Sequence, residues 1–122
     1  MSRLLLDDAH IHPAIRDTVA QLHRDLVQQV QTAVSTHPIV VVGMRGNPFV
    51  KKARRALTEA GHAHEYLEFG SYFAEWRRRN ALKMWTGWPT FPMVFVRGTL
   101  VGGAQELQRL IASGELKRLL AA

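Results

Sequence analysis

The stretch Trp88-Pro89-Thr90-Phe91-Pro92 runs directly into the apolar segment Met93-Val94-Phe95-Val96. A proline just before a strand shapes a sharp approach loop, and the Phe91-Pro92 bond could be cis there because a tertiary amide largely loses the trans preference. A cis bond would turn the backbone of Phe91 outward, where an extended peptide could pair with it as an added strand. The segment therefore predicts a ligand-facing turn; a rigid turn that binds nothing is the alternative.

Outward from this loop, the chain alternates between helical and strand patterns. Met93–Val96 and Thr99–Val101 predict a hairpin around Arg97-Gly98, and the β-branched run Ile39–Val42 predicts a strand buried on both faces. Further strand and helix patterns cover about 62–68, about 72–84, 104–112 and 115–120. The resulting order is α, β, α, β, α, β, β, α, α, which indicates one α/β domain over residues 1–122.

The first helix is predicted from an apolar stripe that repeats every three or four residues. Its members are Ile15, Val19, Leu22, Leu26, Val30 and Ala33. Pro13 suits a first helical position, and His37-Pro38 breaks the pattern. We expect residues 1–12 to form a flexible N-terminus and residues 13–35 to pack on the domain as one helix.

Composition limits the classes of function. Hydrophobic residues make up 47% of the chain and charged residues 21%, as in an ordinary globular domain. Asp7-Asp8 interrupts the run Leu4–Leu6, so we expect no signal peptide, no membrane span and a cytoplasmic location. The net charge of +6 is concentrated in clusters such as Arg45–Arg55. A solvated helix face is the preferred interpretation of this cluster, and weak nucleic-acid binding through Lys51–Arg55 is a less favoured one.

A helix start at Asn47 is predicted by an N-cap residue followed by Pro48 at the first helical position. The free amides and the positive end of the helix dipole favour an anion or a strong acceptor at such a place. The Asn47 amide would fill that role, contributing about 1 kcal/mol to stability. We expect Val50, one turn on, to pack inward.

Three segments together carry a family resemblance. His37–Gly46 resembles a strand followed by a Met-Lys-Gly loop, Trp88–Pro92 matches a Trp-Pro-Thr-Phe-Pro signature, and Gly102-Gly103 is similar to a glycine pair after the hairpin. From about Thr18 onward, the chain resembles the glutaredoxins of the thioredoxin-like superfamily, especially the monothiol class. The resemblance implies a thioredoxin-like (glutaredoxin) α/β fold, with a four-stranded mixed sheet flanked by helices and an added N-terminal helix.

The resemblance also implies a cleft for glutathione. Its predicted ligand-binding residues are Arg45, Asn47, Phe49, Arg79, Lys83, Thr90, Phe91, Pro92, Gly103, Ala104 and Gln105. Arg45 would stand for the loop lysine, although the loop here is shorter, and Arg79 would meet the glycine carboxylate with help from Lys83. Phe91 would pair with the cysteinyl unit, and the amides from Gly103 on would hold the γ-glutamyl carboxylate. Gln105 stands where relatives commonly have Asp, which removes a charge for the ligand's ammonium group.

The chain contains no cysteine, and Asn47 and Val50 occupy the two cysteine positions of the family. Thiol-disulfide exchange needs a thiolate, and so does protein ligation of an iron-sulfur cluster, so we expect no catalytic residue and no cluster. The pairs His10/His12 and His62/His64 are each only half of a metal site, so no metal is expected.

These observations predict a redox-inactive glutaredoxin-like domain that binds glutathione, a γ-glutamyl peptide or an extended segment of a partner protein. The alternative is a protein-interaction scaffold that uses the N-terminal helix and the basic face and leaves the cleft empty.

Overall fold

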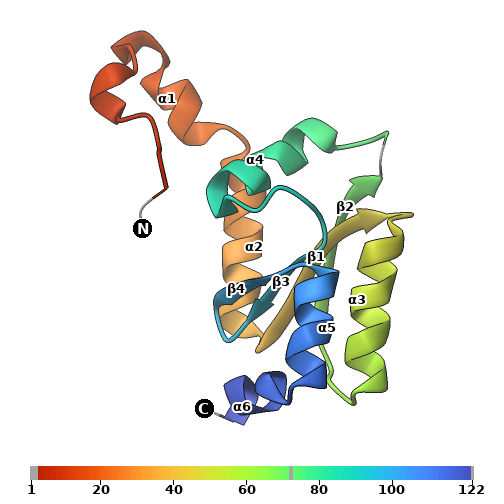
Figure 1. The fold of residues 1–122 in the computed structure, drawn as a ribbon. Coiled ribbons are helices and arrows are strands. Elements are labelled where there is room, and N and C mark those ends of the chain that lie inside the picture. Colours follow the sequence, from red (N-terminus) through yellow and green to blue (C-terminus); the bar gives the residue numbers. More distant parts are fainter. Residues whose placement is uncertain (1–2, 72, 122) are drawn as a thin grey trace.

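The computed structural model describes residues 3–71 and 73–121 (Figure 1). Its elements are η1 (Asp8–His10), α1 (Pro13–Gln21), α2 (Arg24–Thr36), β1 (Ile39–Arg45), α3 (Pro48–Glu59), β2 (Glu65–Ser71), α4 (Trp76–Thr86), β3 (Met93–Val96), β4 (Thr99–Gly102), α5 (Ala104–Ala112) and α6 (Glu115–Ala121). The predicted α/β architecture, a four-stranded mixed sheet flanked by helices, is confirmed. Across these described ranges, no helix combines the length and the apolar character that crossing a membrane requires.

The sheet has the strand order β2-β1-β3-β4, with β1 parallel to β2 and antiparallel to β3. Successive residues of β1 point to opposite faces, as the pleat dictates. Val40 and Val42 join the core beneath α2 and α4, whereas Ile39 and Val41 join the core beneath α3 and α5. Both faces are therefore covered, which explains why the predicted central run is apolar throughout (Figure 1).

The predicted single N-terminal helix is divided into α1 and α2, which corrects the prediction. His23 takes a left-handed conformation with φ of 46° between them, and histidine tolerates this region better than most residues do. Leu26 of α2 is fully buried against the sheet, whereas Val19 of α1 and Leu22 after it are about half exposed. Figure 1 shows α1 beyond the end of the sheet, so the stripe is buried only where the sheet lies beneath it.

Two boundaries in the middle of the chain also differ from the sequence prediction. The second strand was predicted over about 62–68, but β2 covers Glu65–Ser71, because His62 donates its N–H to Leu57 and completes the end of α3. The following helix begins at Trp76 rather than near residue 72; Tyr72 lies outside the described residues. The helix ends at Thr86, where Gly87, with φ of 77°, donates to Lys83.

Gly43 lies in β1 directly beneath the first turn of α3. A Cβ atom on Gly43 would lie 2.6 Å from Cγ2 of Val50 and 2.9 Å from its Cγ1. No real side chain tolerates such contacts, so α3 can approach β1 this closely only because residue 43 is glycine.

Candidate functional site

Three chain segments meet at one edge of the sheet. Because β3 runs antiparallel to both β1 and β4, the end of β1, the start of β3 and the end of β4 share that edge. The register places Val42 opposite Met93, and Val94 opposite Gly102. The start of α3, the loop before β3 and the start of α5 are therefore neighbours (Figure 1).

The start of α3 has the predicted cap. Oδ1 of Asn47 accepts hydrogen bonds from the N–H groups of Phe49 at 2.8 Å and Val50 at 3.1 Å, and Asn47 is only 5% exposed. Val50 packs inward at 2% exposure, as predicted, while the Phe49 side chain is 57% exposed. Positions 47 and 50 thus hold a hydrogen-bonded amide and a buried aliphatic side chain. Neither can ionise at this helix start.

The loop before β3 contains the cis peptide bond Phe91-Pro92 that the sequence predicted as an option. The side chain of Phe91 is 7% exposed, and Thr90 lies on the surface. Within the described residues, neither the N–H nor the C=O of Phe91 has a hydrogen-bond partner. The main chain of Phe91, at a bend before β3, is thus unpaired beside the helix starts.

Lys83 and Arg79 lie one turn apart on α4, but their side chains have different partners. Nζ of Lys83 lies 5.8 Å from the ring centroid of Phe91, which places a positive charge beside the loop. Arg79 is 4% exposed and donates from Nη1 to the carbonyl oxygens of Phe69 at 2.8 Å and Ala74 at 2.6 Å. The Arg79 guanidinium therefore holds the end of β2 to the turn before α4, a structural role that the sequence analysis did not foresee.

Arg45 is exposed at the end of β1 and lines a pocket of about 370 Å³ that also includes Asn47 and Val50 at the start of α3. Lys51 and Arg54 of α3 line the same pocket, together with Tyr66 and Glu68 of β2. Arg45 therefore lies at the start of α3, in a pocket to which three basic side chains contribute.

A polar cluster packs along the wall of that pocket. The guanidinium carbon of Arg54 lies 4.0 Å from the ring centroid of Tyr66, and its Nε donates to Nε2 of His64 at 3.4 Å. The Tyr66 hydroxyl donates to Glu68 at 3.1 Å. Burial, assisted by Glu68, raises the pKa of Tyr66 to about 12, so the phenol stays protonated and its ring stays available to Arg54.

The pKa of His64 gives a test of this cluster. Burial lowers the pKa of His64 from its usual value of 6.5, and the charge of Arg54 acts in the same direction. Because the folded pKa lies below the unfolded one, the contribution of His64 to stability is fully present above about pH 6.5 and is lost as the pH falls through the folded pKa.

We expect urea unfolding to show a smaller loss of stability between about pH 7.5 and 5 in His64→Gln than in the natural sequence. His10→Gln, an exposed control, should keep the original slope; equal slopes in all three proteins would contradict the prediction.

At the start of α5, the main-chain N–H of Gly103 is already hydrogen-bonded to the Glu106 carboxylate, although it was predicted to bind a ligand. The N–H of Gly103 donates to Oε1 of Glu106 at 2.9 Å, whereas Ala104 is buried and Gln105 is exposed. The sequence analysis missed Glu106, although a glutamate three residues after a helix cap is a known signal. Glu106 places a negative charge one residue after Gln105.

The indole of Trp88 closes the site against the glycine pair. A Cβ atom on Gly103 would lie 3.3 Å from the carbonyl oxygen of Pro92 and 3.6 Å from Nε1 of Trp88, so glycine allows this close approach. Among the described residues, Nε1 of Trp88 is buried and has no hydrogen-bond partner. An unpaired buried donor costs about 1–3 kcal/mol, which is the kind of cost that binding sites commonly carry.

No group of three or more His, Asp or Glu side chains that could hold a metal ion occurs in residues 3–71 and 73–121.

Comparison with known proteins places this arrangement among glutaredoxins. Residues 39–101 match the Glutaredoxin family model. A glutaredoxin-like protein of Dictyostelium discoideum is 41% identical over 102 residues, covering 84% of this chain and 83% of its own length. Monothiol glutaredoxin-S11 of Oryza sativa is 31% identical, covering 78% of this chain but 20% of that longer protein.

Comparison with solved structures also gives glutaredoxins as neighbours in fold. A crystal structure of a buckwheat glutaredoxin-glutathione complex superposes with a TM-score of 0.71 at 23% identity, covering 83% of this chain and 92% of that one. At that level of identity, the likeness concerns the fold.

Proposed function

The chain belongs to the glutaredoxin family, and from this premise we propose that it binds glutathione, or a related γ-glutamyl or extended peptide, without reducing it. The observation that carries the proposal is the unpaired main chain of Phe91, which lies at the edge of the sheet where α3 and α5 begin. An extended ligand gains main-chain hydrogen bonds there that water would otherwise make.

Charges around Phe91 suit a ligand that carries both signs. Lys83 supplies a cation beside the loop, and the amides at the start of α5 that remain beyond Gly103 suit a carboxylate. The family's ligand also carries an ammonium group, and Glu106 offers a carboxylate next to the position where Gln105 lacks one. We propose that Glu106 takes over this charge.

The proposed function does not include reduction of the ligand, because the chain has no thiol. Reduction of a disulfide by exchange requires a thiolate on the protein to attack one sulfur and release the other. Asn47 cannot attack, and its side-chain oxygen is already bound to two amides. The same lack of thiolates means that the residues present do not fit an iron-sulfur cluster. We therefore propose a pseudoenzyme that acts by binding.

Calorimetric titration with glutathione tests the proposal. We expect binding, and about tenfold weaker binding for Lys83→Glu, because the change reverses the charge beside Phe91. Lys117→Glu in α6 makes the same change of net charge away from the site and should leave the affinity unaltered. S-methylglutathione should bind as tightly as glutathione, since no protein thiol uses the ligand's sulfur.

Either of two outcomes would count against glutathione as the ligand: no heat with millimolar glutathione, or equal weakening by Lys83→Glu and Lys117→Glu.

A further inference from the structure

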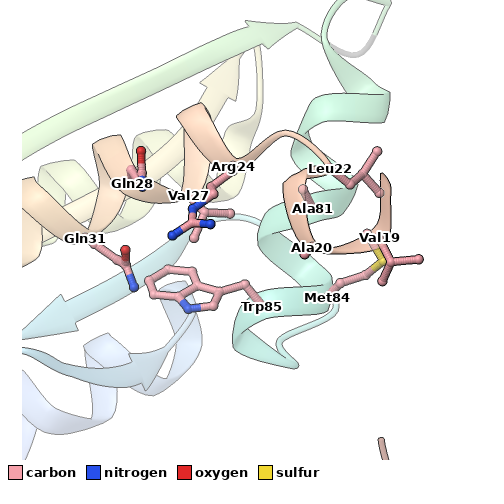
Figure 2. A pocket seen from close by; sticks show the side chains of 10 residues that line it. All are labelled: Val19, Ala20, Leu22, Arg24, Val27, Gln28, Gln31, Ala81, Met84 and Trp85. Atoms are coloured by element: carbon pink, nitrogen blue, oxygen red, sulfur yellow. The ribbon is translucent and has the colours of Figure 1, made fainter. Parts of the chain in front are cut away.

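A second concave surface lies on α2 and α4, away from the Phe91 site. It is a groove of about 600 Å³, which falls within the usual size range of small-molecule sites (Figure 2). None of its lining residues belongs to the predicted glutathione set. Lys83 of α4 meets Phe91, whereas its sequence neighbours Met84 and Trp85 line the groove.

The apolar part of the groove comes from two helices and the end of a third. Ala81, Met84 and Trp85 form the α4 side, Val27 forms part of the α2 side, and Val19 and Leu22 close one end where α1 leaves the sheet. The indole of Trp85 stacks on Phe95 of β3 with ring centroids 6.2 Å apart, so it is a firmly packed wall.

This apolar surface is open to solvent. Met84 is 57% exposed, Val19 51% and Leu22 47%. They remain so because the turn at His23 carries α1 away from the line of α2. Covering these side chains would remove apolar area from water, which favours a ligand with an apolar body.

The polar part of the groove is confined to one helix. Arg24, Gln28 and Gln31 follow each other at spacings of four and three residues and so share one face of α2. In the part of the chain that the structure describes, none of these three side chains has a hydrogen-bond or ion-pair partner. The nearest carboxylate in sequence, Asp25, is bound to Arg78 at 2.6 Å.

Arg24 is therefore a guanidinium without a counter-charge at the rim of an apolar groove. A guanidinium pairs best with a carboxylate, through charge-assisted and often bidentate hydrogen bonds, and the two glutamine amides can donate further hydrogen bonds. The rest of the groove offers only apolar contact and suits a hydrocarbon chain or ring.

We propose that this groove binds an amphiphilic carboxylate: an apolar chain or ring system that carries one carboxylate group. The carboxylate meets Arg24, Gln28 and Gln31, and the apolar body lies on Trp85, Met84 and Leu22. Binding here is independent of the Phe91 site, because α4 presents different residues to the two places.

Sodium decanoate is a suitable probe, with decyltrimethylammonium as a matched amphiphile of opposite charge. In calorimetric titrations of the whole chain, we expect decanoate to bind at about one molecule per chain and the cation to bind at least about tenfold more weakly. Arg24→Gln should weaken decanoate binding by about tenfold. Arg109→Gln, which removes an arginine from α5, should leave binding unchanged, as should saturation with glutathione.

The proposal is overturned by any of four results: no decanoate binding up to about 1 mM, equal affinity for the two amphiphiles, equal effects of Arg24→Gln and Arg109→Gln, or uptake of many decanoate molecules per chain. Arg24 lies on an exposed helix face, so its variant should fold, and far-UV circular dichroism verifies this before titration.

Discussion

Asn47→Cys is expected to give this unreactive chain a nucleophile. The two amides that now donate to the Asn47 oxygen, those of Phe49 and Val50, would be available to a thiolate at the same place. A thiolate at a helix start is also stabilised by the dipole, which lowers a cysteine pKa from about 8.5 to about 7 or below. The expected result is rapid alkylation by iodoacetamide near neutral pH, where the natural chain has no thiol to alkylate.

Val50→Cys provides the matched control. It introduces the same functional group one helical turn later, within the apolar core, whereas position 47 meets two main-chain amides. Its thiol should react at least about tenfold more slowly, because it is buried among apolar side chains. The pH dependence of the alkylation rate gives the pKa of each thiol directly. An ordinary pKa at position 47, or equal reactivity at both positions, would show that the start of α3 does not activate a thiol.

The same variant separates binding from chemistry. If the Phe91 site holds glutathione, Asn47→Cys should form a mixed disulfide with glutathione disulfide faster than Val50→Cys does, by more than their alkylation rates differ. Mass spectrometry follows the added glutathionyl group. Suppose that Asn47→Cys reacts rapidly with iodoacetamide but shows no extra preference for glutathione disulfide over Val50→Cys. The start of α3 would then activate a thiol, but the Phe91 site would not bind glutathione.

Arg79→Met is expected to destabilise the fold by about 2–4 kcal/mol. The variant keeps an unbranched apolar stem but removes the donors that satisfy the carbonyl oxygens of Phe69 and Ala74. Phe69 lies in the core under α4, so its carbonyl would lose its partner where water has little access. Urea unfolding measures the loss.

Arg77→Met, two residues earlier on the same helix, is the control. Arg77 is exposed and lies over the Trp76 ring at 5.1 Å, a contact worth less than about 1 kcal/mol. Similar losses in the two variants would show that the buried hydrogen bonds of Arg79 contribute little. A large loss for Arg79→Met alone also means that a substitution at Arg79 would change folding as well as binding, whereas a substitution at Lys83 tests binding.

The sequence predicted most of the architecture because its signals are local. The run Ile39–Val42 is apolar at every position, which indicates burial on both faces, and Asn47-Pro48 marks a helix start. The division of the first helix was not predictable in this way. Its apolar stripe continues without interruption through Leu22, and only the length of the sheet beneath it determines where burial ends.

The site was predicted less completely, because the hydrogen-bond partners of its residues depend on tertiary contacts. The family resemblance and its motifs predict that Arg79 and Gly103 bind a ligand, but they do not indicate whether the donors of these residues are already used. Arg79 is bound by carbonyls of Phe69 and Ala74, and Gly103 by the carboxylate of Glu106. These partners depend on tertiary contacts or on a side chain that the motif does not include. The calorimetric comparison of Lys83→Glu with Lys117→Glu therefore tests the site more directly than the motif does.

The contact between Gly43 and Val50 restricts the order in which this chain can acquire mutations. Any side chain at position 43 would collide with the methyl groups of Val50, so position 50 must first become smaller, or α3 must first move away from β1. Conversely, a chain that has lost the glycine cannot accept valine at position 50. The two sites therefore form an epistatic pair, and position 50 can hold a branched aliphatic residue only while glycine is kept at position 43.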